Sequence, residues 1–316
     1  MSAFIDLNNR LIQACLPDLL RDKTTQKNIV FATDSYAEYG RDYQADMEIF
    51  SDLLAVMDLK PRILKAYDEQ ALRTRKKAEV FTPAWLCCRM NNHCDDEWFE
   101  RPDVFNHLEG QHWRVTTEPI RFPEKKNWKK YVDSRRLEIT CGEAPYIVSR
   151  YDAAAGSAIP LPDRIGMLDR KLRIVNENTS NLEDWFQWTL RAFQSVYGYE
   201  WQGDSLLIAR INLFMTFVEY YEARWGAIPE DKSFARMVSQ IVNVIAWNFW
   251  QMDGLTGTVP HGALEEVPVE EPQQFMLFGL EEPAETKPAP EKRVKCQVRD
   301  WRTKEILTFN SLKKGY

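Results

Sequence analysis

The sequence contains no run of about 18 consecutive apolar residues, the length that a membrane-crossing helix needs. We therefore expect no membrane-spanning segment. Near the start of the chain, Asp6 and Asn8 stand where a secretion signal would need an apolar stretch, so we expect a cytoplasmic location. The six cysteines are spread irregularly over 316 residues, which favours reduced thiols over a disulfide framework.

Excess positive charge is also absent, because 47 acidic residues outnumber 41 basic ones and the formal net charge is −6. This balance excludes a globally basic nucleic-acid-binding protein, although it leaves open a local basic face. Basic clusters occur at residues 73–77 and 164–173. We predict that they contact phosphate groups, with a solvated turn as the alternative for the first cluster. The predicted contacts are Arg73, Arg75, Lys76, Lys77, Arg170 and Lys171.

Residues that commonly bind metals form one short cluster, made of Cys87, Cys88, His93 and Cys94. Structural zinc sites usually take their ligands as two well-spaced pairs. No second pair follows this cluster at a recognisable spacing. We therefore predict no metal site in this chain.

The two ends of the sequence differ in character from its middle. Residues 1–70 carry apolar residues at helical spacing, in the stretches 7–15 and 47–57, and predict a helical N-terminal region. Residues 261–292 repeat Glu and Pro with little apolar periodicity, which predicts an acidic linker. Residues 293–316 alternate with period two on both sides of a turn, which predicts a detached β-hairpin.

The middle of the chain, residues 71–260, contains a pattern typical of a strand, a tight turn and a helix. The apolar residues Leu137 and Ile139 lead into Thr140-Cys-Gly-Glu143, and the helix-compatible run 146–148 follows. In an open α/β sheet such a turn lies at the carboxyl edge, where ligands bind. A glycine at position 142 would let the backbone approach a ligand closely, although a plain connection is the alternative.

Two later segments end on an acidic residue. The β-prone run from Ser195 ends at Glu200, and an apolar segment from Val244 finishes at Asp253, which begins an Asp-Gly turn. In nucleotide-binding sheets, an acid at the tip of the strand after the glycine turn bonds a ribose. The alternative for Glu200 is an ordinary surface carboxylate.

Four motifs appear in a fixed order along residues 74–255. Together they resemble the S-adenosylmethionine-dependent N6-adenine DNA methyltransferases, including the modification subunits of restriction systems. The motifs are Val80-Phe-Thr-Pro83, Leu137-Glu-Ile-Thr-Cys-Gly-Glu143, Tyr197-Gly-Tyr-Glu200 with Ile208-Ala-Arg-Ile-Asn212 after it, and Gln251-Met-Asp-Gly-Leu255.

This resemblance implies an α/β fold with a Rossmann-like, mostly parallel sheet, helices on both faces, and insertions at about 95–136 and 152–180. It implies S-adenosyl-L-methionine as the cofactor and double-stranded DNA as a partner, together with a possible restriction or specificity subunit. Thr82 is expected to cap a helix whose first residue is Pro83. The implied cofactor-binding residues are Phe81, Thr82, Pro83, Thr140, Cys141, Gly142, Glu143, Glu200 and Asp253.

The sequence also departs from the family pattern. Ala144 and Pro145 follow where the family has a second glycine, and the catalytic Asn/Asp-Pro-Pro-Tyr/Phe motif is missing. That motif holds the target amino group and stacks the flipped base. The nearest substitute is Asp300-Trp301, for which a simple turn in the hairpin is the alternative.

Three hypotheses follow from these patterns. The first is an active adenine methyltransferase that acts on DNA. The second is a catalytically inactive module of the same fold that binds DNA or sets specificity for a partner protein. The third is a helical interaction protein without a cofactor, since much of the signal is helical and aromatic.

Overall fold

The computed structural model describes residues 4–65, 82–261 and 293–312. The basic cluster Arg73, Arg75, Lys76 and Lys77, as well as Phe81, lies outside the described residues, and so do residues 262–292 of the expected linker. Within the described parts of the chain, no helix is both long and apolar enough to cross a membrane.

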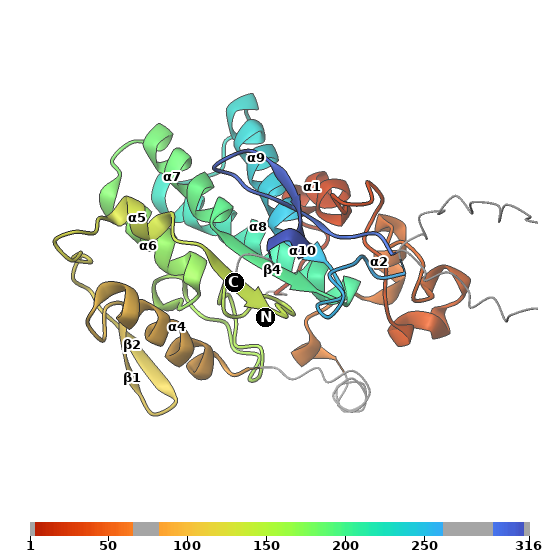
Figure 1. Cartoon of the computed structure of the whole chain (residues 1–316), viewed down its shortest axis with the longest axis horizontal. Coiled ribbons are helices and arrows are strands. Elements are labelled where there is room, and N and C mark those ends of the chain that lie inside the picture. The colour runs from red at the N-terminus through yellow and green to blue at the C-terminus, as the bar shows by residue number, and fades with distance from the viewer. Residues whose placement is uncertain (1–3, 66–81, 262–292, 313–316) are drawn as a thin grey trace, which may run out of the picture.

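A parallel sheet of three strands lies at the centre of the fold (Figure 1). Its strands are β3 (Arg136–Ile139), β4 (Val196–Glu200) and β5 (Phe249–Gln251), in the order β3-β4-β5. Because all three strands run in the same direction, their carboxyl ends meet at one edge of the sheet. The expectation of a mixed α/β fold with a parallel sheet is confirmed.

Two pairs of helices connect the strands. The helices α6 (Met167–Asn178) and α7 (Leu182–Gln194) lead from β3 to β4, while α8 (Gly203–Trp225) and α9 (Lys232–Asn248) lead from β4 to β5. Side-chain caps begin two of them: Asn181 accepts from the Asp184 N–H, and Asp231 accepts from the Phe234 N–H. The apolar residues Leu182, Trp185, Phe186, Leu190 and Phe193 recur at helical spacing in the sequence, which predicts the helix that the structure shows as α7.

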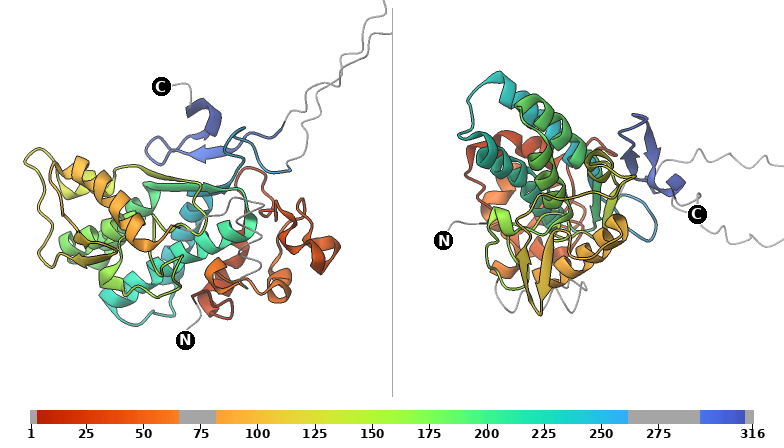
Figure 2. Two further views of the ribbon diagram at one scale, coloured as in Figure 1. Left: turned by 90° about the horizontal axis from the view of Figure 1, so that it is seen from below. Right: turned by 90° about the vertical axis from the view of Figure 1, so that its left-hand side faces the viewer.

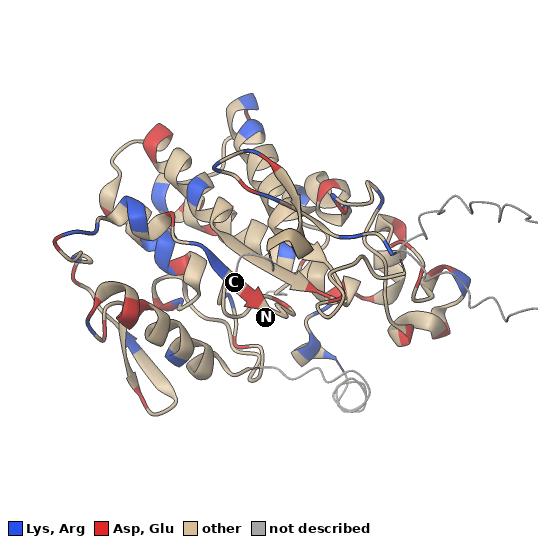
Figure 3. Ribbon diagram, in the orientation of Figure 1, with Lys and Arg blue, Asp and Glu red and all other residues tan. Residues whose placement is uncertain are grey.

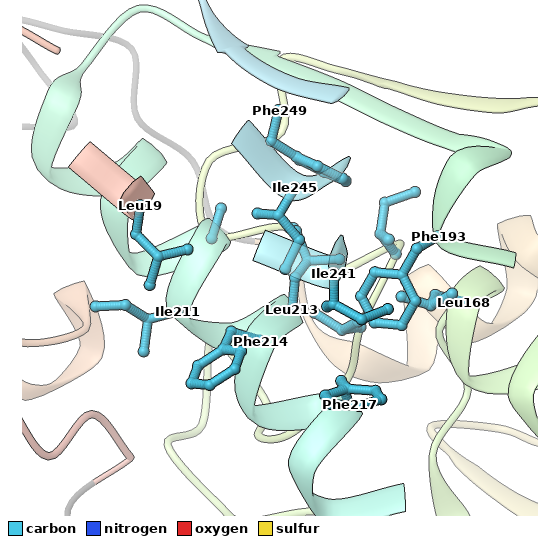
Figure 4. Packing of buried hydrophobic residues seen from close by; sticks show 14 of the residues in the cluster. Leu19, Leu168, Phe193, Ile211, Leu213, Phe214, Phe217, Ile241, Ile245 and Phe249 are labelled. Carbon is cyan, nitrogen blue, oxygen red and sulfur yellow. The ribbon is translucent and has the colours of Figure 1, made fainter. Parts of the chain in front are cut away.

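The larger hydrophobic core lies between the sheet and these helices (Figure 4). Val196 and Phe249 face it from the strands. A side chain at Gly198 would lie 2.8 Å from the Phe249 ring, so glycine is needed there for close packing. The labelled helix residues of this core are Leu168, Phe193, Ile211, Leu213, Phe214, Phe217, Ile241 and Ile245.

The C-terminal segment covers part of the opposite face of the sheet. It contains β6 (Gln297–Arg299), β7 (Ile306–Thr308) and the short helix α10 (Phe309–Leu312), and β6 and β7 pair antiparallel. Tyr199 and Trp250 from the sheet pack with Cys296 and Val298. The predicted hairpin is confirmed, but it is docked on the sheet rather than detached, and it stands where long helices were expected (Figure 2).

The N-terminal region is only partly helical. Its elements are α1 (Arg10–Leu20), the 3-10 turns η1 (Asp34–Tyr39) and η2 (Arg41–Tyr43), α2 (Ser51–Met57) and the turn η3 (Arg62–Leu64). The helix α1 packs on α9, and its Ile12 and Leu19 belong to the main core. The N-terminal region is therefore part of the same hydrophobic unit as the sheet.

Short elements occupy the first expected insertion. The helix α4 (Ala84–Phe99) precedes a hairpin of β1 (Asn106–Glu109) and β2 (His112–Val115), and α5 (Trp128–Val132) follows. The second expected insertion, 152–180, contains the turn η4 (Leu161–Asp163) and the whole of α6. Because α6 forms the first half of the crossover to β4, this stretch belongs to the core of the fold.

Candidate functional site at the carboxyl edge of the sheet

The three chain segments that were predicted to form the site do end at the same edge of the sheet. Cys141 follows β3, Glu200 ends β4, and Asp253 follows β5. The Gly142 N–H donates to Glu200 Oε2 at 2.9 Å, and the Met252 N–H donates to the Glu200 carbonyl oxygen at 3.0 Å. Glu200 therefore links the ends of all three strands.

The backbone at Gly142 has the left-handed conformation that favours glycine, with φ of +50°. A Cβ added there would find no atom within 4 Å, so the space beside this residue is open. Thr140 is exposed, whereas Cys141 is buried and its N–H donates to the Tyr199 carbonyl oxygen at 2.8 Å. The turn is thus fixed on its sheet side and accessible at the glycine.

No helix follows this turn directly, contrary to the sequence prediction for residues 146–148. Ala144 is left-handed, with φ of 65°, and its carbonyl oxygen accepts the N–H groups of Ile147 and Val148. Pro145 accounts for the difference, because a proline disfavours the helical conformation of the residue before it. The next helix, α6, begins only at Met167, so it does not present its N-terminus to Gly142.

Glu143 has a structural role rather than an exposed binding role. Its side chain is buried, accepting the Arg62 N–H at 2.8 Å and the Tyr151 hydroxyl at 2.5 Å. Asn212, from the predicted Ala-Arg-x-Asn helix, donates to the Glu143 carbonyl oxygen at 3.2 Å. These bonds tie the turn to the N-terminal region and to α8.

The carboxylate of Glu200 is buried but well placed to accept hydrogen bonds. In addition to the Gly142 N–H, it accepts the Gln202 N–H at 3.1 Å through its second oxygen. Both carboxylate oxygens therefore accept backbone N–H groups, and these bonds hold the turn in shape.

Glu138 is a buried acid that the sequence reasoning missed. The apolar residues Leu137 and Ile139 are 45% and 64% exposed, while Glu138 between them is only 7% exposed. One of its oxygens accepts the Tyr146 N–H at 3.4 Å, and Oε2 has no hydrogen-bond partner. Burial raises the pKa of Glu138 well above its ordinary value, with a further contribution from the charge of Glu200. The alternation within a four-residue strand is too short to have revealed the inward position of this acid.

Asp253 is engaged in its own turn. One carboxylate oxygen accepts the N–H groups of Leu255 at 2.9 Å and Thr256 at 3.4 Å. Burial acts to raise the pKa of Asp253, but these hydrogen bonds outweigh it and the pKa is lowered. Asp253 therefore offers a negative charge at the third strand end.

The Thr82-Pro83 motif lies beside the loop that follows Gly142. Pro83, rather than Thr82, is the N-cap of α4, so this helix begins one residue later than predicted. The Ala84 N–H donates to Asp152 at 3.1 Å, and Asn91 donates to the Tyr146 carbonyl oxygen at 2.9 Å. These two bonds join α4 to residues 146–152 of the loop that follows the central turn.

Arg170 and Lys171 cannot contact DNA, because both are buried in the core. Arg170 is 2% exposed and donates to Asp95 at 2.6 Å and to Asn92 at 2.7 Å. Lys171 is 0% exposed and donates to the Val132 carbonyl oxygen at 3.1 Å. Burial lowers the pKa of Lys171 well below its ordinary value. The prediction that these two residues contact phosphate is wrong.

Asp300 and Trp301 lie at the opposite edge of the sheet from Gly142. Asp300 accepts from Arg135, which precedes β3, at 3.0 Å. Trp301 donates to Asn248, which precedes β5, at 2.7 Å. The four residues of β3 span roughly 13 Å between the two edges. Asp300 and Trp301 are turn residues of the hairpin and cannot serve as the catalytic pair of this site.

The cysteines of α4 pack inside the fold. Cys87 and Cys88 are fully buried and lie in a small hydrophobic cluster with Ile165. Burial raises the pKa of Cys88 to about 11, so its thiol stays protonated near neutral pH. Among the described residues, His, Cys, Asp and Glu form no group of three that could hold a metal ion.

No known protein family, curated protein or solved structure matches this chain. The geometry of the site and the motifs of the sequence are therefore what a functional assignment has to rest on.

Proposed function

We propose that this protein binds S-adenosyl-L-methionine and acts as an adenine-N6 DNA methyltransferase-like protein. The observation that carries the proposal is the bond from the Gly142 N–H to the Glu200 carboxylate across two adjacent parallel strands. At this edge of an open α/β sheet, an acid on the second strand accepts ribose hydroxyls while the glycine turn admits the rest of the nucleoside.

Three groups would divide the binding of the cofactor. Glu200 would accept the ribose hydroxyls, the open side of Gly142 would admit the backbone contact, and Asp253 would face the adenine amino group. Thr82 and Pro83, beside the same loop, would lie against the methionine part. When bound, the cofactor supplies the methyl group, and the residues of this chain hold and orient it.

A second candidate function is a non-catalytic module that binds the cofactor or DNA for a partner protein. The position of Asp300 and Trp301 favours it, because methyl transfer to adenine needs an acceptor for the amino group and an aromatic face for the flipped base. The nearest sequence substitute for those groups lies at the far edge of the sheet.

Calorimetric titration with S-adenosylmethionine tests the cofactor site. We expect wild-type protein to bind, and Glu200→Gln to weaken binding by about 1–3 kcal/mol, or roughly 5- to 150-fold, because it removes a charged acceptor. The matched control is Glu222→Gln, at an exposed acid of α8, which should leave the affinity unchanged. No binding by the wild type, or equal affinity of Glu200→Gln, would refute the assignment.

Transfer of a labelled methyl group from S-adenosylmethionine to unmethylated duplex DNA separates the two candidates. Incorporation into adenine that Glu200→Gln reduces would establish the enzyme. Cofactor binding without any transfer would favour the non-catalytic module.

A further inference from the structure

Positive charge gathers on one surface of the protein, around α5 and the start of β3 (Figure 3). We call it the α5 surface. Five of its six basic side chains are exposed, and Arg191 is half-buried. The whole chain carries a formal net charge of −6, so this cluster of positive charge is opposite in sign to the net charge of the protein. The six residues are Lys125, Lys129, Lys130, Arg135, Arg191 and Arg302.

Ion pairs hold the parts of this surface together. Arg302, from the β6–β7 turn, pairs with Asp133 at 2.6 Å, and Arg191 from α7 pairs with the same carboxylate. Arg135 pairs with Asp300 at 3.0 Å. Both carboxylates are therefore already engaged by arginines, and positive charge remains in excess over them. Segments far apart in the sequence are fixed as one basic face.

A hollow of about 500 Å³ opens on the α5 surface. Lys129 stands beside it, with its amine 5.2 Å from the centre of the Trp188 ring and 5.5 Å from that of Trp128. Such cation–π contacts restrain a long side chain without removing its charge. One carboxylate, Asp133, lines the hollow and is engaged by Arg191 and Arg302. The other polar groups of its lining are ammonium, guanidinium and amide donors, from Asn127, Lys129, Lys130, Gln187, Arg191 and Gln194.

We infer that the α5 surface binds the phosphate backbone of double-stranded DNA. Lysine, arginine and amide donors on one face are the groups that position a protein on a duplex without reading its sequence. The rest of the protein carries net negative charge and repels DNA, so the electrostatic field of the protein would direct DNA to this face. The identity of the partner rests on the second candidate of the proposed function, a module that binds DNA without transferring a methyl group, because Arg135 and Arg302 lie at the edge of the sheet opposite to Gly142. The surface replaces Arg170 and Lys171 as the contact site.

Fluorescence anisotropy with a labelled DNA duplex, at salt from about 50 to about 200 mM, tests the inference. The test variant is Lys129→Gln/Lys130→Gln. We expect its slope of log affinity against log salt to be shallower by about 1.8 than in the wild type, since each phosphate contact contributes about 0.9. At about 0.1 M salt this corresponds to a roughly 10- to 60-fold loss of affinity.

The matched control is Lys232→Gln/Arg236→Gln, which removes the same charge from exposed positions of α9. It should keep the wild-type slope, and circular dichroism should show both variants folded. Absence of DNA binding by the wild type, or equal slopes for the two variants, would overturn the inference.

Calorimetry with S-adenosylmethionine on the same proteins keeps the two proposals apart. If the cofactor binds and the α5 variant keeps its DNA affinity, the inference fails while the cofactor site stands. If no cofactor binds but the DNA slope falls as expected, the proposed function fails and the DNA surface stands.

Discussion

Replacing Arg170 by Met tests whether the buried hydrogen bonds and ion pair of its guanidinium stabilise the fold. The guanidinium of Arg170 donates to Asp95 at 2.6 Å, to Asn92 at 2.7 Å and to the Ile165 carbonyl oxygen at 3.1 Å. Methionine keeps an unbranched stem of similar length but removes all three bonds. It would leave Asp95, which is 4% exposed, with the Tyr131 hydroxyl and a more distant arginine as partners.

The size of the effect follows from the burial of both partners. Removing one member of a buried ion pair costs about 3–5 kcal/mol, because the other charge is left without compensation. Arg136 lies 3.5 Å from Asp95 and retains part of the pairing, so we expect the lower end, about 3 kcal/mol. A typical domain has about 5–15 kcal/mol of stability, so this loss is large.

Urea unfolding followed by tryptophan fluorescence measures this loss. Arg236→Met, at an exposed position of α9, is the control and should change stability by no more than about 0.5 kcal/mol. Adding Asp95→Leu to Arg170→Met should cost less than the sum of the single changes, since neither member of the Arg170–Asp95 pair is then left behind as a buried charge. A change below about 0.5 kcal/mol for Arg170→Met, or strict additivity, would refute this reasoning.

Two further predictions concern Asp169 and Gly142. Burial raises the pKa of Asp169 from 3.8 to about 6, so its contribution to stability is present at acid pH and lost as pH rises through about 6. Asp169→Asn should remove this loss, so the free energy of unfolding of the variant should rise by about 3 kcal/mol relative to that of the wild type between about pH 4 and 7. Urea unfolding at several pH values measures this difference, and parallel pH profiles of the two proteins would contradict the prediction. Gly142→Ala, at φ of +50°, should cost about 1–2 kcal/mol and weaken S-adenosylmethionine binding. Gly110→Ala, also left-handed with open space, should cost the same without affecting cofactor affinity, and equal effects on affinity would count against the site.

Local patterns predicted much of the fold. The apolar spacing after Asn181 predicted α7, because this helix buries a side chain every third or fourth residue. The helix α8 is buried on all sides over its first half, so its long apolar run, rather than a periodic stripe, marked it. The strand that ends at Glu200 and the turn at Asp253 were also found where the sequence indicated. These features depend on residues that are close together in the sequence, so they can be predicted from the sequence alone.

Features that depend on distant partners were not predictable in the same way. Arg170 looks like part of a surface cluster, but its acidic partner Asp95 lies 75 residues earlier. At β3, which is an edge strand, Leu137 and Ile139 face outward and the acid between them faces the core. A run of four residues carries too few alternations to decide which face is buried when both inward positions, Arg136 and Glu138, are charged.

Hydrogen–deuterium exchange with and without S-adenosylmethionine shows whether the three strand ends form one cofactor site. We expect the cofactor to slow exchange together in three separate segments, around Gly142, after Glu200 and around Asp253. Unchanged exchange in these segments at saturating cofactor, or protection confined to another part of the protein, would contradict this expectation.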